Sequence, residues 1–444
     1  MKKCHLLAAV VVALMWGVEA NSQDLSHAWT LSECIDWALE HNIDLLSRQN
    51  TIDRDSIELS TTKLDRLPSL SASASENLSF GRGLTADNTY ANTNTTSTSF
   101  SIGSGVSLFN GFRARNNIKI GSLNLEAAVQ DLEKARDDIR VAVARSFFQI
   151  LYNQEILGVA ERQIQIDSAQ VERLGEMLLA GKATQAEVAQ QKASLAQSRV
   201  TLVQAGNELS LSLLELAQLL ELPSPEGFTI ASPEGAGSLE ERLLPSPESI
   251  FASAVENKPS VRAEQLRLQS SDATIALAKS SLYPSLSLSG GIGSNYYTTS
   301  QNVPQSGFWD QLSNNFSQYV GISLNIPIFN KFATRNGIRS AKLGKESQAL
   351  RLESVKKSLY KEIQQAYYNA LAAREKYTSS LTASASYEEA FNLVTARYEN
   401  GKATITEFNE SKNQYLKAAS DLVQASYEYL FQTRLLDFYR GGAL

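Results

Sequence analysis

The segment Gly181-Lys182-Ala183-Thr184 comes nearest to a catalytic motif in this sequence, because glycine followed by lysine occurs in nucleotide-binding loops. The spacing does not fit such a loop. The preceding glycine, Gly175, lies one residue too far away, and Ala183 stands where a serine or threonine would hold magnesium. We therefore expect that no nucleotide binds here.

Few other side chains could act as nucleophiles or as soft-metal ligands. After the first twenty residues, His27 and His41 are the only histidines, Met177 is the only methionine and Cys34 is the only cysteine. A single cysteine cannot form an internal disulfide, and Cys34 with His41 is more simply one face of a helix than a nucleophile pair. We expect no enzyme, no cofactor and no bound metal, and the net charge of -6 argues against nucleic acid.

The first twenty residues have the pattern of a secretory signal peptide. Lys2 and Lys3 precede an apolar run over residues 6–18, and small residues follow it. This run of about 13 residues is shorter than the roughly 20 that a spanning helix needs. We expect the mature chain to start near Asn21, and because two lysines and one glutamate leave with the signal, its formal charge becomes -7. No later stretch approaches a transmembrane helix, so any passage through a membrane would use strands.

The remainder of the chain is two copies of one plan. The segment 181–184 recurs unchanged at 401–404, and Phe109-Asn110 recurs as Phe329-Asn330, in both cases 220 positions later. Earlier in each copy the offset is 216, where Leu67-Pro68-Ser69-Leu70 matches Tyr283-Pro284-Ser285-Leu286. Four extra residues thus lie between these landmarks in the second copy. Because length changes collect in exposed loops, we expect a loop tip there in each copy, with residues 88–99 as the loop of the first.

Two stretches in each copy alternate apolar and polar residues. Leu70, Ala72 and Ala74 alternate with serines, and the same period continues around Ile322. Aromatic residues gather at the ends of these stretches, and they are Phe80, Phe109, Tyr283, Tyr296, Tyr297, Phe308, Trp309, Phe316 and Phe329. A half-buried soluble sheet shows the same alternation, but aromatic girdles and a polar face almost without charge favour transmembrane strands.

Four strands of about 10 residues cannot close a barrel, because the smallest barrels have eight. An open edge in hydrocarbon leaves unpaired backbone groups, so the chain must associate. Three copies would supply twelve strands, whereas two would supply eight, which is too narrow for a useful channel. We therefore expect an α+β membrane protein that is internally duplicated and trimeric, in which each chain contributes four strands to a 12-stranded transmembrane β-barrel.

The segments between the strands have the period of helices. Residues 113–180 and 333–400 contain no proline and would form helices on the order of 100 Å long. Apolar residues recur at sevens from Ile150 to Leu178 and from Val188 to Leu216, which is typical of supercoiled helices. Glycine and threonine at 181–184 and 401–404 would end one helix and begin the next. The long helices should therefore form an antiparallel α-helical coiled-coil barrel.

The expected organisation follows the duplication. A signal peptide covers residues 1–20, the first repeat 21–220, a linker or equatorial belt 221–246 and the second repeat 247–444. Each repeat has a short helix, a β-hairpin and a long helical hairpin. These lie at 31–66, 68–109 and 113–220 in the first repeat, and at 247–282, 284–329 and 333–440 in the second.

This order of elements is similar to that of the outer-membrane efflux protein family of the TolC type. Its sharpest local features are Phe109-Asn110-Gly111, the segment 398–404 and the segment 436–441. The resemblance implies a homotrimer in the cell outer membrane, with its helical part in the periplasm, that acts as the passive exit duct of a tripartite efflux or type I secretion system. The implied partners are a periplasmic adaptor protein, an inner-membrane pump and outer-membrane lipid. Drug efflux and protein secretion both stay open, because the pump selects the cargo.

The resemblance also implies a gate at the periplasmic mouth, made by acidic residues just after the second helical turn. Glu407 and Glu410 occupy the matching positions, Glu187 is the first-copy equivalent of Glu407, and Tyr398 matches a gating tyrosine. Ala403 stands where the family often has a basic residue, for which Lys402 or Arg397 could substitute. The alternative is that these glutamates are ordinary solvated charges.

The two identical turns are the expected docking tips for an adaptor. The residues concerned are Gly181, Lys182, Thr184, Gly401, Lys402 and Thr404. The alternative function is that of a soluble periplasmic coiled-coil structural or adaptor protein. An adaptor usually needs one hairpin that interrupts small β-domains, whereas this chain has two hairpins and amphipathic strands.

Overall fold

The computed structural model describes residues 27–84, 88–232, 244–300, 305–442 and 444. The expected signal peptide, and residues 233–243 of the expected linker, lie outside the described residues. The chain divides into two compact units. A helical unit comprises Met1–Leu46, Ala135–Ala254 and Lys361–Leu444, and a sheet unit comprises Ser47–Lys134 and Val255–Tyr360.

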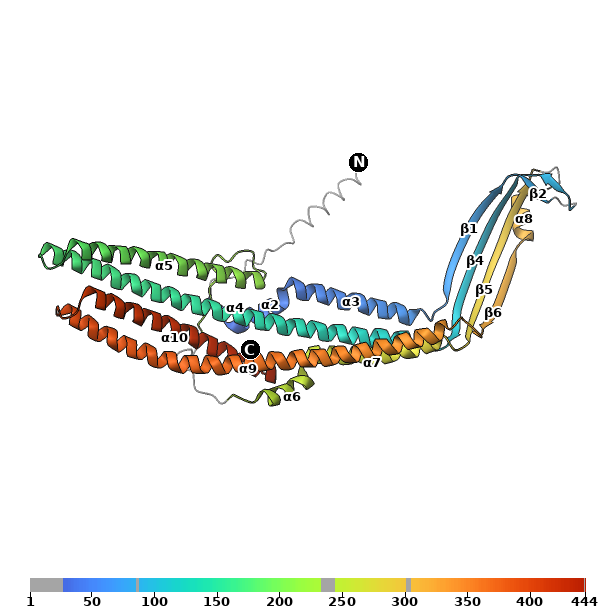
Figure 1. Ribbon diagram of the computed structural model, residues 1–444. Coiled ribbons are helices and arrows are strands. Elements are labelled where there is room, and N and C mark those ends of the chain that lie inside the picture. Colours follow the sequence, from blue (N-terminus) through green and yellow to red (C-terminus); the bar gives the residue numbers. More distant parts are fainter. Residues whose placement is uncertain (1–26, 85–87, 233–243, 301–304, 443) are drawn as a thin grey trace, which may run out of the picture. The chain divides into compact units, whose positions relative to one another are not determined.

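The sheet unit contains an antiparallel sheet of four strands in the order β1-β4-β5-β6 (Figure 1). The strands are β1 (Ser69–Ser79), β4 (Thr95–Asn110), β5 (Ser285–Thr299) and β6 (Ser317–Asn325). Because β1 and β4 come from the first copy and β5 and β6 from the second, the central β4–β5 pairing joins the two copies. The expected sheet of four strands is confirmed, and β1 and β6 form its edges.

The register of the sheet gathers the apolar residues on one face. Ile102 lies opposite both Ala72 and Ile292, and Leu288 lies opposite Ile322, so alternate residues of all four strands share this face. In the single chain the face is uncovered, since 83% of Val320 and 77% of Leu70 are exposed. A contiguous apolar surface of this kind marks a site of interaction with another protein or with a membrane.

The connections between the long strands have structure of their own. β2 (Arg82–Leu84) and β3 (Tyr90–Asn92) pair as a small ribbon. The helix α8 (Phe308–Asn314) forms part of the chain segment that connects β5 to β6. The expectation of a plain loop over residues 88–99 is therefore wrong in part, because β3 falls within it and β4 begins at Thr95. Threonine and serine are compatible with strand pairing where a neighbouring strand, here β5, supplies the hydrogen bonds.

Each of the short helices is interrupted once. The first is divided into α2 (Leu31–His41) and α3 (Ile43–Leu64), and the second into α6 (Pro247–Asn257) and α7 (Pro259–Ser280). At the first break Asn42 has an extended backbone, and its side-chain oxygen accepts from the backbone N–H groups of Asp44 and Leu45, which begins a new helix. At the second, Pro259 disfavours the helical conformation of Lys258, which is extended.

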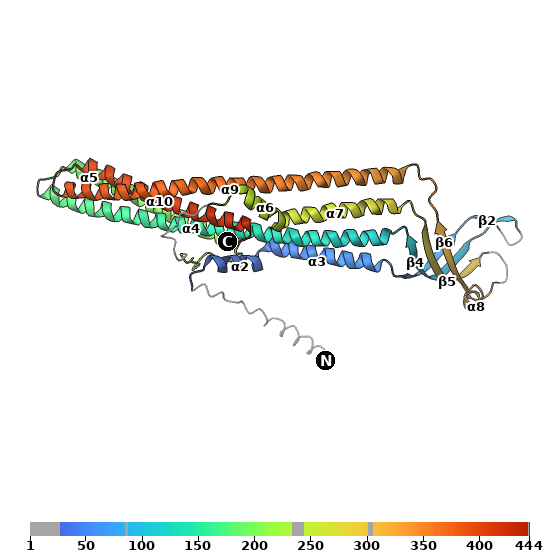
Figure 2. The ribbon, with the colours of Figure 1, turned by 90° about the horizontal axis from the view of Figure 1, so that it is seen from below.

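The long helices have the expected length. α4 (Arg113–Leu179) and α9 (Ala333–Glu399) each contain 67 residues, and α5 (Gln185–Leu219) and α10 (Ile405–Arg440) return from them. Both views show α4 turning back into α5, and α9 into α10 (Figures 1 and 2). Part of the seven-residue pattern packs inside the helical unit, where Ile150, Leu216, Tyr429 and Leu436 are buried, whereas 36% of Leu178 is exposed.

The described part of the expected belt is held to the start of the chain by a short parallel β-bridge. Trp29 pairs with Ile230, and the backbone N–H of Trp29 donates to the carbonyl oxygen of Thr229 at 2.8 Å. The part of the chain that the structure describes contains no helix with both the length and the apolar character needed to cross a membrane.

Candidate functional site

The two turns of the helical hairpins have the same backbone geometry. Gly181 and Gly401 adopt φ values of +70° and +69°, in the left-handed region that favours glycine. The following residue in each turn donates its backbone N–H to the carbonyl oxygen five residues back, from Lys182 to Met177 and from Lys402 to Arg397, both at 2.8 Å. These bonds form the Schellman motif that satisfies the last carbonyl groups of a helix. The repeated tip sequence thus encodes one repeated structure.

Glu187 and Glu407 each close a capping box at the start of the returning helix. The Glu407 carboxylate accepts from the backbone N–H of Thr404 at 2.7 Å, and the Glu407 N–H donates to the Thr404 hydroxyl at 3.2 Å. Glu187 and Thr184 repeat this arrangement with the same two distances. In both glutamates the hydrogen bond from the threonine backbone N–H lowers the pKa of the carboxyl. These two carboxylates are therefore engaged by their own helix termini.

The sign of this pKa shift sets the pH range in which the capping boxes are stable. A carboxyl whose pKa is lowered by folding stabilises the folded state above its usual pKa. That contribution is lost as the pH falls through the lowered pKa of Glu187 and Glu407. At neutral pH both boxes are fully formed.

Glu410 differs from the two capping glutamates. It is exposed and lines an open groove with Gln190 of α5 and with Thr406, Asn409 and Asn413 of α10. Phe408, on another side of α10, is buried with only 4% of its surface exposed. The structure thus places Glu410 away from the packing side of α10.

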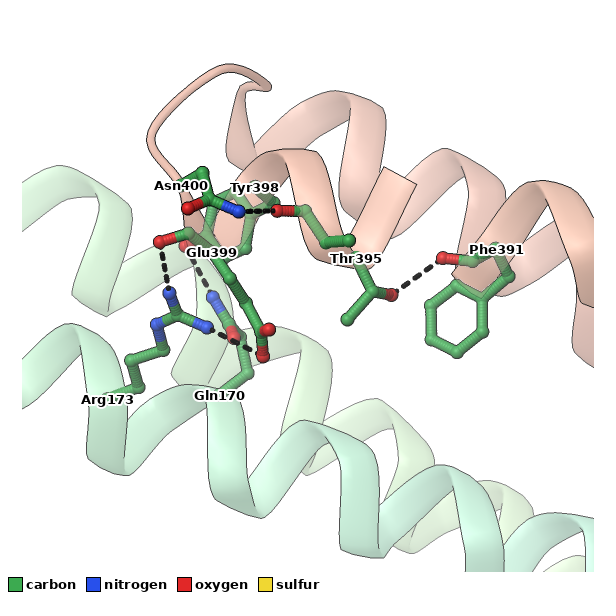
Figure 3. A network of polar contacts seen from close by, with 8 residues as sticks. Gln170, Arg173, Phe391, Thr395, Tyr398, Glu399 and Asn400 are labelled. Atoms are coloured by element: carbon green, nitrogen blue, oxygen red, sulfur yellow. Dashed lines mark hydrogen bonds and ion pairs between the residues drawn. The ribbon is translucent and has the colours of Figure 1, made fainter. Parts of the chain in front are cut away.

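Tyr398 joins the two hairpins just behind their tips (Figure 3). Its hydroxyl accepts a hydrogen bond of 2.5 Å from the amide of Gln170 on α4, and both side chains are buried. The guanidinium of Arg173 lies 5.1 Å from the centroid of the tyrosine ring and pairs with Glu399 at 3.4 Å. Burial raises the pKa of Tyr398, so its hydroxyl stays neutral at physiological pH. We call Gln170, Arg173, Tyr398 and Glu399 the tip layer.

A second set of contacts lies further from the tips and is centred on a fully buried ion pair. The ammonium of Lys412 on α10 donates to Asp167 on α4, and the two side chains are 1% and 0% exposed. Asp167 also accepts from the amide of Gln191 at 3.0 Å and from the hydroxyl of Ser198 at 2.5 Å, both on α5. Gln191 in turn accepts from Asn409 of α10 at 3.1 Å. We call these five residues the buried cluster.

The two sets of contacts differ in strength. Arg173 and Glu399 are 33% and 56% exposed, and an ion pair of this kind contributes about 0–1 kcal/mol. Removal of one partner from a buried pair costs about 3–5 kcal/mol, because it leaves an uncompensated charge in the interior. Loss of one charged partner should therefore cost more in the buried cluster than at the Arg173–Glu399 pair.

Sequence reasoning did not find Asp167, Gln170, Arg173 or Lys412. An aspartate and a lysine that are 245 positions apart give no local signal of pairing. The capping role of Glu187 and Glu407 did have a signal, since threonine followed three residues later by glutamate is the capping-box pattern. Among the described residues, no group of three or more histidine, cysteine, aspartate or glutamate side chains could hold a metal ion.

The described chain has duplicated helical hairpins, a four-stranded sheet with an exposed apolar face, and polar contacts that join the hairpin tips. A fold does not by itself give a function, and comparison with known proteins supplies the class. The family model described as outer membrane efflux protein matches residues 34–221 and 251–442. The chain belongs to this family, and it is an outer-membrane channel of efflux and secretion systems.

Individual relatives are distant but span nearly the whole chain. The outer membrane efflux protein BepC of Brucella suis is 22% identical, over 96% of this chain and 88% of its own. Protein CyaE of Bordetella pertussis is 23% identical, over 87% of this chain and 79% of its own. The crystal structure of the Campylobacter jejuni CmeC outer membrane channel superposes with a TM-score of 0.77 at 17% identity, over 93% of this chain and 86% of that one.

Proposed function

We propose that three copies of this chain form one exit duct, with a shared β-barrel in the outer membrane and a helical tube in the periplasm. The observation that carries the proposal is the open sheet of four strands, whose apolar face is uncovered and whose edge strands are β1 and β6. In hydrocarbon, such edges must pair with other strands. Three copies supply twelve strands and enclose a channel, whereas two supply eight and leave little room.

The short helix α8 supports the location of one membrane boundary. α8 lies at the end of the apolar face. The ring centroids of Phe308 and Tyr296 are 4.9 Å apart, and 79% of Trp309 is exposed. The helix is fastened to β5, since Gln311 bonds both the N–H and the carbonyl oxygen of Tyr297, each at 3.0 Å. An exposed tryptophan beside an apolar face is typical of the membrane–water interface. We propose that α8 lies in the headgroup layer.

The membrane proposal is tested with tryptophan fluorescence in vesicles that contain brominated lipid. After replacement of Trp29 and Trp37 with phenylalanine, Trp309 should be quenched best by bromine near the headgroups. Ile322→Trp, with Trp309 also replaced, should be quenched best by bromine deep in the acyl chains, because Ile322 lies within β6.

Chemical crosslinking of the detergent-extracted protein should stop at three copies. A monodisperse monomer whose strands are protected from hydrogen exchange would contradict the assembly.

We further propose that Glu407 and Glu410 make the periplasmic mouth selective for cations. In a trimer each carboxylate is present three times around the axis, and a ring of like charges attracts cations and repels anions. Glu410 is exposed and available for this role, whereas Glu407 is also held in its capping box.

The gate prediction therefore uses glutamine, which preserves the capping-box pattern. Glu407→Gln combined with Glu410→Gln should lower cation selectivity and block by multivalent cations, with no change in assembly. Reversal potentials in planar bilayers under a salt gradient measure this effect. Glu410→Gln alone should produce most of it, since the Glu407 carboxylate already accepts hydrogen bonds from Thr404. If the double variant keeps the parent's selectivity, these glutamates are ordinary solvated charges.

The hairpin tips are the surface that we propose for a periplasmic adaptor, which would connect the duct to an inner-membrane pump. In the described turns the exposed tip residues are Gly181, Lys182, Gly401 and Lys402. The helix caps Thr184 and Thr404 are exposed as well. The cargo would be chosen by the pump, so small molecules and proteins both fit a passive duct.

The competing function is that of a soluble periplasmic coiled-coil protein. Heat-modifiable migration of the detergent-extracted protein on a gel would distinguish this function from that of an exit duct, because such migration is expected only of a barrel.

A further inference from the structure

The helix ends that adjoin the sheet carry an excess of positive charge. Residues 60–66, 110–122, 276–284 and 328–342 contain ten basic residues and one acidic residue, Asp65, although the whole chain has a net charge of -6. The ten basic residues, which are all exposed and which we call the basic collar, are Lys63, Arg66, Arg113, Arg115, Lys119, Lys279, Lys331, Arg335, Arg339 and Lys342. They lie where α3 and α7 end and where α4 and α9 begin (Figures 1 and 2).

The internal duplication keeps six of these charges as three matching pairs. The pairs are Lys63 and Lys279 at the offset of 216, and Arg115 and Arg335, and Lys119 and Arg339, at the offset of 220. An ordinary solvated helix end can carry a charge of either sign. Positive charge in both copies is expected if both copies meet the same anionic surface.

The basic residues of α4 point away from the two helices that pack against it. The Asn116 amide donates to a serine hydroxyl of α7 at 3.2 Å, and Gly121 lies beside a leucine of α3. With 3.6 residues per turn these two contact positions are about 140° apart, and Arg115 and Lys119 both lie in the remaining sector of about 220°. In a ring of helices that encloses a tube, the wider sector faces outward, because both neighbours of a helix lie toward the inside. On the proposed duct, Arg115 and Lys119 therefore face the surroundings and not the channel.

The basic collar also lies at the level expected for one membrane boundary. Aromatic residues meet where the strands end, since the ring centroid of Phe112 lies 5.2 Å from that of Phe109 and 5.9 Å from that of Tyr283. Aromatic rings are enriched at membrane–water interfaces. Arg115 and Lys119 lie only about 3 and 9 Å beyond the start of α4 along its axis. A headgroup layer is about 5–8 Å thick, so their long side chains reach it.

We propose that the basic collar binds the anionic phosphate groups of phospholipids in the periplasmic leaflet of the outer membrane. The proposal rests on the proposed placement of the sheet in that membrane. Lysine and arginine donate charge-assisted hydrogen bonds to phosphate oxygens, and arginine can donate two at once. The attraction falls off within a Debye length of about 8–10 Å, so only basic residues next to the sheet contribute. The basic collar thereby fixes the depth of the duct in the membrane.

The test compares two lipids that differ in the charge of the headgroup. Phe332 lies within the stretch that carries the basic collar and is 57% exposed, so Phe332→Trp is the reporter, combined with Trp29→Phe, Trp37→Phe and Trp309→Phe. In vesicles, brominated phosphatidylglycerol, which is anionic, should quench this reporter as strongly as brominated phosphatidylcholine does at about a fivefold higher mole fraction. Attraction by one basic residue near an anionic surface corresponds to about this factor. High salt should reduce the preference.

Matched variants show whether the basic collar causes the preference. Arg335→Gln combined with Arg339→Gln should lower the preference at least twofold. Arg351→Gln combined with Lys357→Gln removes two exposed charges of the same helix, beginning about 18 Å beyond Arg339, and should leave the preference unchanged. A protein in which Trp309 is the reporter, at the other end of the sheet, should show no comparable preference.

The outcomes separate the proposal from its premise. Equal quenching by the two lipids at the Phe332→Trp reporter would overturn it, and so would a preference that survives Arg335→Gln with Arg339→Gln. An altered reversal potential in that variant, without any change in the lipid preference, would also overturn it, because the arginines would then face the channel. If neither brominated lipid quenches Phe332→Trp or Trp309, the sheet does not lie in the membrane, and the proposed function itself fails.

Discussion

Lys412→Met is expected to lower the free energy of unfolding of the helical unit by about 3–5 kcal/mol. The substitution removes the ammonium group and leaves the Asp167 carboxylate at 0% exposure, with only Gln191 and Ser198 as donors. Two neutral donors do not replace a positive charge in a low-dielectric interior. Chemical denaturation of the detergent-extracted protein, together with hydrogen exchange along α10, measures the loss.

Two matched variants separate this effect from the general cost of removing a lysine. Lys417→Met removes a lysine of the same helix that pairs with Asp421 four residues later and whose side chain is 77% exposed, so it should leave the free energy of unfolding nearly unchanged. The double variant Asp167→Asn with Lys412→Met leaves no buried charge and should recover much of the stability. If Lys412→Met and Lys417→Met cost the same, the buried cluster contributes no special stability.

Gly401→Val is expected to abolish export while leaving membrane insertion intact. Gly401 has a φ of +69°, and an added Cβ atom would meet nothing within 4 Å, so the cost comes from the backbone conformation and not from a clash. For a β-branched residue this conformation costs about 1–2 kcal/mol, which lowers the equilibrium constant between the native turn and other conformations roughly tenfold. The tip would then present a different surface to the proposed adaptor.

Gly401→Asn is the matched control, because asparagine tolerates the left-handed conformation and is found at this position of helix ends. It should export nearly as well as the parent. The measurement is export in cells, with the amount of trimer in the outer membrane determined in parallel. Because Gly181 has the same geometry, Gly181→Val should have a similar effect. Normal export in Gly401→Val cells would show that the turn has no role in docking.

Local patterns in the sequence determined most of the architecture. Alternation of apolar and polar residues identified the four strands, since side chains on successive strand residues point to opposite faces. The repeat of sevens and the absence of proline identified α4 and α9, and the glycines at 181 and 401 identified the turns. The duplication was visible because both copies keep the residues that these geometries require. All of these features depend on neighbours within a few residues.

Features that depend on neighbours distant in the sequence were decided only by the tertiary structure. The start of β4 at Thr95 depended on the hydrogen bonds that β5 supplies. At the break between α2 and α3, the backbone N–H of Ile43 donates to the carboxylate of Glu221, 178 positions away. Glu187 and Glu407, expected to serve a gate, proved to cap their own helices as well.

The buried cluster is the clearest example of the difference. On its own helix Lys412 is one of two lysines, and the sequence pattern around it is that of a solvated polar position. Folding brings it against Asp167, 245 positions away, and removes both charges from water. Only the packed helices show that these two residues form a buried ion pair, because burial is a property of the assembled interface and not of either segment alone.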